Sequence, residues 1–136
     1  MPLPPSVTAA LDLLHADRLG HGVRSAEDPR LVERLAAEGI TCEVCPSSNV
    51  ALGVAPDPES VPLRTLFEAG VPIALGADDP VLFGRRLVKQ YEIARDVHAF
   101  TPAELAELAR QSLHSAAAPP DIRARLLAGI DAWLAA

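Results

Sequence analysis

The sequence has few of the residues that mark several common classes of protein. It has only two cysteines and 4% aromatic residues, which excludes a fold held by disulfides. Its 12 Lys and Arg stand against 18 Asp and Glu, and this acidic balance argues against nucleic acid as a partner. No apolar run approaches the roughly 20 residues that span a bilayer, and residues 1–5 lack the basic-then-apolar order of a signal peptide. We therefore expect a cytoplasmic protein that binds neither nucleic acid nor a membrane.

The sequence does have enough apolar content for one core. Its 136 residues are 49% hydrophobic, so we expect a single domain over residues 1–136. Five stretches carry the caps, prolines and apolar spacing of helices. They follow Ser6, run from Asp28 to Gly39 and from Ser60 to Gly70, and begin at Thr101 and at Pro119.

Three short runs at residues 17–21, 41–45 and 72–76 alternate with these helices and read as strands. Alternating helices and strands indicate parallel strands, and a step of about 25 to 30 residues matches one unit of a barrel that needs roughly 250 residues in all. We therefore expect an α/β fold, a partial TIM (β/α)₈ barrel with about three parallel βα units plus C-terminal helices. A small doubly wound domain, with the last two helices covering its second face, is the alternative.

Polar residues follow each expected strand, where parallel α/β folds bind their ligands. Asp78 and Asp79 follow the third strand; one carboxylate can ligate a metal while the other binds a substrate. The alternative is a helix N-cap before Pro80. His21, between two glycines, can orient or polarise a nucleophile, or it can be hydrogen-bonded in a turn.

The other histidines and the cysteines fit no such site. Cys42 and Cys45 have the spacing of a redox or zinc motif, but residues three apart on a strand face opposite sides, so we expect neither role. His15, His98 and His114 are expected on helices or helix ends and in contact with solvent.

Three motifs taken together resemble the C-terminal part of the adenosine deaminase family of metal-dependent hydrolases. They are Arg18 to Gly22, Cys42 to Asn49, and Gly70 to Pro80, and their order and spacing both agree with that family. Tyr91 and the helix from Glu104 to Ser112 are also similar to the family's tail. The resemblance implies a zinc-dependent TIM barrel that converts adenosine and water into inosine and ammonia, by attack of a metal-bound hydroxide on the purine carbon that carries the amino group.

The resemblance also implies a role for each matching residue. Asp78 would be the carboxylate ligand of the metal, and Asp79 would hydrogen-bond the purine ring. His21 would be catalytic, stabilising and orienting the attacking hydroxide without ligating zinc. The loop from Pro46 to Asn49 would shape the mouth of the site.

The sequence departs from the family in its metal ligands. The family's His-x-His pair and its His-Ala-Gly-Glu segment, which supply three histidine ligands and the catalytic glutamate, do not occur in these 136 residues. Catalytic zinc normally has three protein ligands, so we expect zinc only if the missing ligands come from elsewhere. Because these ligands and the catalytic glutamate are missing, we expect the chain to be a truncated deaminase that is inactive alone. Its expected partners are a purine nucleoside, a second copy of the chain, or a complementing N-terminal half. The alternative function is a non-enzymatic βα module that pairs with another chain through its exposed sheet.

Overall fold

The structure is a computed structural model, and it describes residues 5–136. Its sheet has three strands, β1 (Arg18–Leu19), β2 (Thr41–Val44) and β3 (Ile73–Leu75), all parallel and in the order β1-β2-β3. The three predicted parallel strands are therefore confirmed, although each is shorter than the run that predicted it. The order follows the sequence without the reversal of a doubly wound sheet, so the doubly wound alternative is not supported.

Eight α-helices and two 3₁₀ helices accompany the sheet in the described residues. The α-helices are α1 (Pro5–Leu14), α2 (Pro29–Glu38), α3 (Pro46–Ala51), α4 (Leu63–Glu68), α5 (Pro80–Phe83), α6 (Leu87–Asp96), α7 (Pro102–His114) and α8 (Pro120–Ala135); the 3₁₀ helices are η1 (Val23–Glu27) and η2 (Pro58–Ser60). The five predicted helices are present as α1, α2, α4, α7 and α8. The sequence signals did not predict α3 or α6, and they offered a helix start at Pro80, where α5 begins, only as an alternative.

Local signals explain where the predicted helices begin and end. The Asp28 side chain accepts a hydrogen bond from the nitrogen of Arg30 at the start of α2, and Gly39 ends that helix with φ 67°. Thr101 and Glu104 form a capping box at the start of α7. The predicted helix from Ser60 to Gly70 is instead divided: η2 ends at Ser60, and α4 begins only after Pro62.

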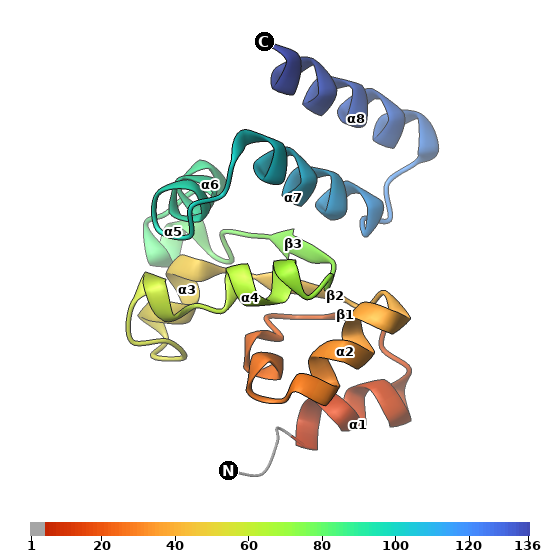
Figure 1. Cartoon of the computed structure of the whole chain (residues 1–136), viewed down its shortest axis with the longest axis vertical. Helices are drawn as coiled ribbons and strands as arrows, with labels where there is room; N and C mark the ends of the chain where they lie inside the picture. The colour runs from red at the N-terminus through yellow and green to blue at the C-terminus, as the bar shows by residue number, and fades with distance from the viewer. Residues whose placement is uncertain (1–4) are drawn as a thin grey trace.

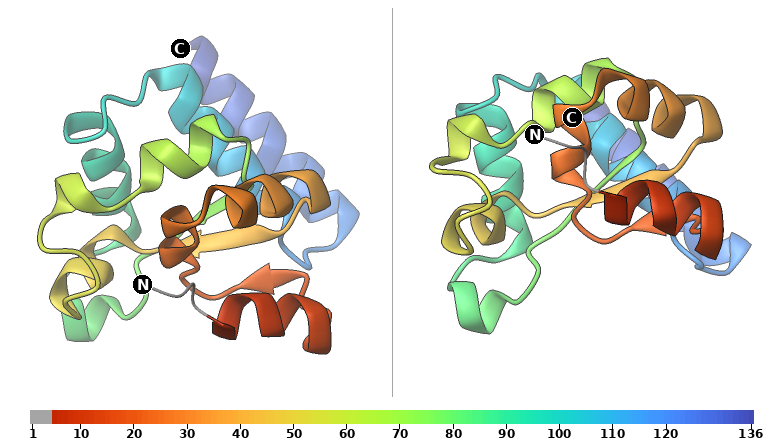
Figure 2. Two further views of the ribbon diagram at one scale, coloured as in Figure 1. Left: turned by 60° about the horizontal axis from the view of Figure 1, so that its bottom comes forward. Right: turned by 90° about the horizontal axis from the view of Figure 1, so that it is seen from below.

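The helices form layers around the sheet. Figure 1 shows α7 on the β3 side and α8 as the outermost helix, packed on α7, and the left view of Figure 2 shows α1 beside β1. The two views of Figure 2 show α8 behind α7 from other directions, and β1 and β2 side by side. The chain leaves β2 into α3 and β3 into α5, and α3 contacts both α5 and α6. These short helices therefore build the carboxyl end of the sheet.

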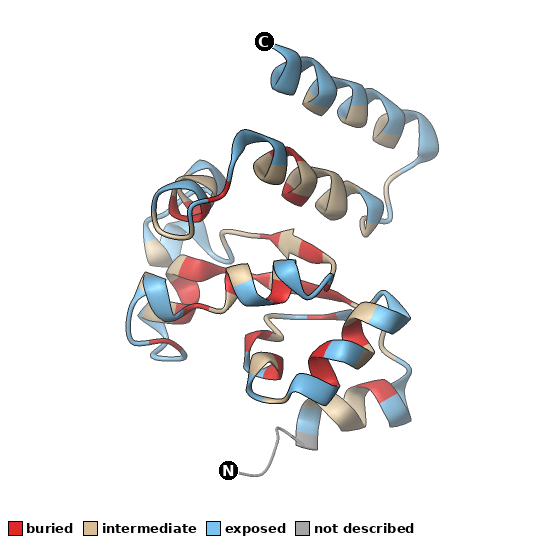
Figure 3. Ribbon diagram, in the orientation of Figure 1, coloured by how far each residue is buried: buried red, intermediate tan, exposed pale blue. Residues whose placement is uncertain are grey.

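One face of the sheet forms the core. Alternate strand residues are buried against residues of α2, α4 and α7, as the distribution of buried segments in Figure 3 shows. The strand residues of this cluster are Leu19, Cys42, Val44, Ile73 and Leu75, and the helix residues include Leu35, Leu63, Leu66 and Leu108. By contrast, α8 has no buried residue, so it adds little to this core.

The opposite face of the sheet is more polar and less covered. Arg18 and Glu43 lie on it and form an ion pair of 2.8 Å between partly exposed side chains. In the described part of the chain, β1 and β3 pair only with β2, so each has an outer edge. Part of the β3 edge is satisfied by α7, since the backbone nitrogen of Ile73 donates to Gln111 Oε1 at 2.9 Å.

Candidate functional site

The candidate site lies at the carboxyl end of the sheet, where three segments meet. His21 follows β1, α3 follows β2, and Asp78 follows β3. His21 Nε2 lies 3.7 Å from Asp78 Oδ2, with side chains that are 43% and 34% exposed. The predicted convergence of these two residues is therefore present, and both remain accessible from solvent.

Backbone conformation holds His21 and Asp78 in place. Both are left-handed, with φ 65° and φ 57°, which is uncommon for residues other than glycine. Such conformations cost energy, and they persist where the surrounding structure enforces them. Gly22 next to His21 also has a positive φ, and a Cβ built on it would lie 2.9 Å from Cys42 Sγ. The His21 loop is thus pressed against β2, where only glycine fits.

Ser48 and Asn49 on α3 contact Asp78 and His21 from the buried side of the site. The Ser48 hydroxyl donates to Asp78 Oδ2 at 2.6 Å, and Asn49 Nδ2 lies 3.5 Å from His21 Nδ1. Both α3 residues are fully buried. The predicted loop from Pro46 to Asn49 is wrong, because these residues belong to the first turns of a helix. The role of this segment at the mouth of the site stays a prediction.

The reason for the error is that α3 has a weak local signal. Its N-cap is Cys45, whose side chain makes no capping hydrogen bond, so no Ser, Thr, Asp or Asn marks the start. A tertiary contact stabilises the first turn instead. The backbone nitrogen of Ser47 donates to Oε1 of the fully buried Gln90 on α6, at 3.0 Å. Pro46 at the first helical position was the one available sign.

The Asp79 side chain makes different contacts from the Asp78 side chain. Its Oδ1 accepts hydrogen bonds from the backbone nitrogens of Val81 at 3.0 Å and Leu82 at 2.9 Å, so it caps α5. The N-cap alternative of the sequence analysis is thus confirmed for Asp79. The role of Asp79 toward a purine ring stays a prediction.

The two cysteines lie under the site as neutral thiols. Both are free and buried, and burial raises the pKa of each to about 11. For Cys45, the value of about 11 already includes a smaller upward effect of the nearby Asp78 carboxylate on the pKa and a downward effect of a hydrogen bond from the Asp78 backbone. Cys42 packs beneath Gly22 and Cys45 beneath Gly76. Cys42 and Cys45 are not joined by a disulfide, and each fills space under a different loop.

A zinc ion does not fit the residues of this chain alone. Within residues 5–136, no three His, Cys, Asp or Glu side chains come together as a set that could hold a metal. The site offers the Asp78 carboxylate with one imidazole beside it, and both thiols are buried and neutral. Catalytic zinc sites need three protein ligands, so a metal at Asp78 needs ligands from outside these residues.

The remaining histidines lie outside the site, and one differs from expectation. His98 is half-buried rather than fully solvated, and its Nε2 has no hydrogen-bond partner within the described residues. Burial lowers the pKa of His98, because the charged imidazolium would lose its hydration there. His15 and His114 are exposed, as predicted.

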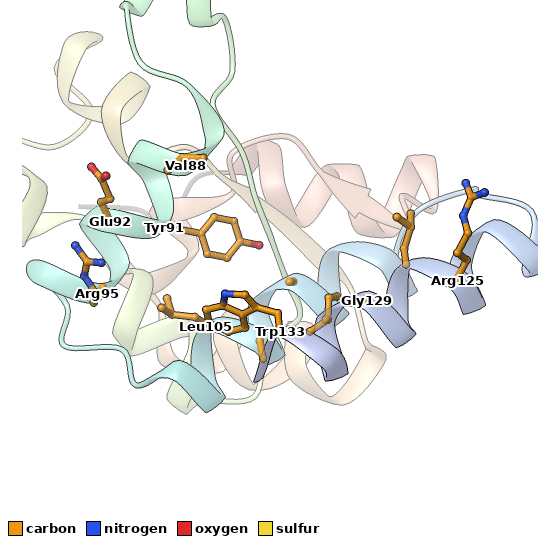
Figure 4. Close-up of a pocket in the computed structure, with 12 residues that line it drawn as sticks. Val88, Tyr91, Glu92, Arg95, Leu105, Arg125, Gly129 and Trp133 are labelled. Atoms are coloured by element: carbon orange, nitrogen blue, oxygen red, sulfur yellow. The ribbon is translucent and has the colours of Figure 1, made fainter. Parts of the chain in front are cut away.

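A wide apolar groove lies away from the site. It encloses about 560 Å³ between α6, α7 and α8, and Figure 4 shows Tyr91 of α6 and Trp133 of α8 on opposite sides of it. None of the site residues lines this groove. A smaller cavity, of about 330 Å³, borders His21 and Asn49.

Comparison with known proteins agrees with this geometry. The family model for adenosine deaminase matches residues 2–133. The chain belongs to the adenosine deaminase family. A protein of Streptomyces virginiae with the provisional name adenosine/adenine deaminase is 72% identical over 131 residues, which cover 96% of this chain and 39% of that protein. The adenine deaminase of Rhizobium leguminosarum is 47% identical over 90% of this chain and 38% of that protein.

Two solved structures have the same fold over the region that this chain matches. Adenine deaminase from Arthrobacter aurescens superposes with a TM-score of 0.92 at 36% identity, over 97% of this chain and 40% of that structure. A zinc-bound amidohydrolase from Burkholderia ambifaria superposes with a TM-score of 0.82 at 30% identity, over 98% of this chain and 37% of that structure. Since these neighbours are TIM-barrel enzymes, the predicted partial barrel is confirmed. The chain spans about 39% of the length of the relatives it matches. No helix within residues 5–136 is long and apolar enough to cross a membrane.

Proposed function

We propose that this chain forms one side of the active site of a purine deaminase, which converts adenosine and water into inosine and ammonia. The observation that supports this most is the arrangement of His21, Asp78 and Ser48 at the carboxyl end of three barrel strands. A buried serine and a histidine both face one oxygen of a single carboxylate. The names of the relatives, which specify adenosine or adenine, support an aminopurine as the substrate class.

In this proposal each site residue has a separate role. Asp78 is a metal ligand, oriented by the Ser48 hydroxyl on Oδ2. His21 is catalytic and orients the attacking oxygen nucleophile by a hydrogen bond. Asp79 binds the purine ring; its Oδ1 caps α5, and we assign the ring contact to Oδ2. The cap fixes the position of the Asp79 carboxylate and so prepares it for the substrate.

The zinc of such a site requires further ligands, and we propose that another polypeptide segment supplies them. That segment corresponds to the remaining three-fifths of the relatives. The outer edges of β1 and β3 and the polar face with Arg18 and Glu43 are where such a segment would complete the barrel. Zinc, when bound, supplies a water of lowered pKa as the nucleophile.

A chimera tests this proposal. The matching region of the Streptomyces virginiae relative is replaced by this chain, and ammonia release from adenosine and from adenine is measured with the unmodified relative as control. We expect the chimera to retain activity on at least one of the two substrates, and His21→Ala, Asp78→Ala and Asp79→Ala each to lower kcat/KM by at least about 100-fold. A folded, zinc-loaded chimera without activity, or full activity in all three variants, contradicts the proposal.

The second candidate function is an interaction module without catalysis. The unpaired strand edges favour it, because such edges pair readily with other chains. Light scattering after gel filtration measures the mass of the purified chain. A dimer or larger assembly with no zinc uptake favours the module, whereas a monomer that gains zinc affinity when mixed with the rest of the relative favours the deaminase.

A further inference from the structure

Asn49 is the polar side chain packed against the inner nitrogen of His21. It is fully buried, and its Oδ1 has no hydrogen-bond partner within the described residues. A buried amide with an unpaired oxygen lowers stability, and a leucine of similar size would avoid that cost. Such a group needs an explanation other than packing, and the neighbouring imidazole supplies one.

The backbone holds the Asn49 amide in a fixed position. The backbone nitrogen of Asn49 donates to the backbone carbonyl of Cys45 at 2.8 Å. The backbone carbonyl of Asn49 accepts hydrogen bonds from the nitrogens of Val54 at 2.8 Å and Ala55 at 3.1 Å. The helix that carries it is tied to α6 through Gln90. Asn49 therefore has little freedom to move away from His21, whereas the His21 side chain, 43% exposed, depends on its neighbours for its orientation.

The two neighbours of His21 agree on where a neutral ring carries its proton. On one side, Nε2 faces Asp78 Oδ2 at 3.7 Å, and a carboxylate oxygen only accepts hydrogen bonds. On the other side, Nδ1 faces Asn49 Nδ2 at 3.5 Å, and an amide nitrogen only donates. A proton on Nδ1 would require the amide to be reversed, and it would leave the Nε2 lone pair facing the carboxylate.

We propose that Asn49 is a positioning residue, which holds the neutral ring of His21 with its proton on Nε2 and its Nδ1 lone pair toward the Asn49 amide. In this state His21 presents an N–H donor at the site. The value of that donor for catalysis rests on the function proposed above, in which His21 orients the attacking oxygen. The inferred tautomer is argued from the two contacts and does not depend on that function.

Nitrogen NMR of the histidine rings tests the tautomer directly. The full chain is labelled with ¹⁵N in its histidines and measured in alkaline buffer, and His21→Gln assigns the His21 signals. The ring nitrogen shifts report which nitrogen carries the proton. We expect wild-type His21 to carry it on Nε2. A wild-type ring with its proton on Nδ1 would overturn the proposal.

Two substitutions at Asn49 separate positioning from packing. Asn49→Asp has nearly the same shape but only acceptors, so it should move the proton to Nδ1. Asn49→Leu removes the polar contact, so it should leave a smaller Nε2–H fraction than the wild type has. Ser47→Ala on the same helix turn is the control and should change neither. If both Asn49 variants match the wild type, or if the one that folds does, the proposal is wrong.

This measurement also separates the inference from the proposed function. It needs no substrate, no metal and no turnover, so the tautomer can be confirmed in a chain that does not deaminate anything. In the chimera described above, a correct tautomer without activity would contradict the deaminase alone. An active chimera in which Asn49→Asp leaves the ring nitrogens unchanged would contradict the positioning role alone.

Discussion

The bond from Ser48 to Asp78 sets a measurable part of the stability of the site. The replacement Ser48→Ala removes a hydroxyl that donates to Asp78 Oδ2 at 2.6 Å from a fully buried position. A hydrogen bond to a charged group contributes about 1.5–3 kcal/mol. Because the Asp78 side chain is 34% exposed, water replaces part of the bond. We therefore expect Ser48→Ala to lower the free energy of unfolding by about 1.5 kcal/mol, the lower end of that range.

Urea denaturation, followed by circular dichroism, measures this loss. With a slope of about 1–3 kcal/mol per molar urea for a small protein, the midpoint should fall by about 0.5–1.5 M. Asp78→Asn keeps a side chain that tolerates the left-handed backbone but removes the charge. In that background Ser48→Ala should cost less, with a coupling energy of about 0.5–1 kcal/mol.

Ser47→Ala is the matched control, because it leaves the backbone bond from Ser47 to Gln90 intact. We expect it to change the free energy of unfolding by less than about 0.5 kcal/mol. If Ser48→Ala is no more destabilising than this control, or if its effect is the same with and without the Asp78 charge, the bond does not stabilise the site and the reasoning fails.

Three further predictions follow from the same contacts. Gly22→Ala should lower the free energy of unfolding by about 2–3 kcal/mol, seen as a lower Tm, because it combines a positive φ with a Cβ 2.9 Å from Cys42 Sγ. Cys42 and Cys45, whose pKa values burial raises to about 11, should react with iodoacetamide at pH 8 far more slowly in the folded chain than in urea. A hydrogen bond from Arg64 is the main reason that the pKa of Glu104 is lowered to about 2. The contribution of the Glu104 carboxylate to stability is therefore present above about pH 4.5 and is lost as the pH falls toward 2. Glu104→Gln should make Tm depend less on pH between these two values.

Each of these has its own control. Gly39→Ala also meets a positive φ, but nothing lies within 4 Å of its added Cβ, so it should cost only about 1 kcal/mol. If Gly22→Ala and Gly39→Ala lower the free energy of unfolding equally, close packing of Gly22 against Cys42 does not explain the effect. Glu38→Gln is the control for Glu104→Gln, because it removes a carboxylate from an exposed ion pair with Arg34, and exposed ion pairs contribute little to stability. Fast labelling of the cysteines in the folded chain would show that β2, for Cys42, or the start of α3, for Cys45, is open to solvent.

The main elements of the fold and part of the site were predictable because their signals are local. Caps and first-turn prolines located α2 and α7, and the alternation of helices and strands indicated a parallel sheet. Since parallel strands end at one edge, the sequence also brought His21 and Asp78 to the same place. The cap at Asp79 was open to prediction because Asp before Pro is a common helix start.

The inner support of the site was not predictable for a physical reason. The helix α3 begins at a cysteine that makes no side-chain cap, and the contact that stabilises it comes from Gln90, more than 40 residues later in the sequence. No local pattern records such a contact. The burial of His98 was missed for the same reason, because segments distant in sequence cover it.

Sequence alone determined which residues stand at the ends of the strands and which helices carry caps, since both depend on neighbours within a few positions along the chain. Only the tertiary structure decided that Ser48 faces Asp78, that Asn49 faces His21, and that the two cysteines lie beneath separate loops. Those outcomes depend on how β2 and α3 pack against loops about 30 residues away. Packing of that kind is a property of the folded chain and leaves no local pattern in the sequence.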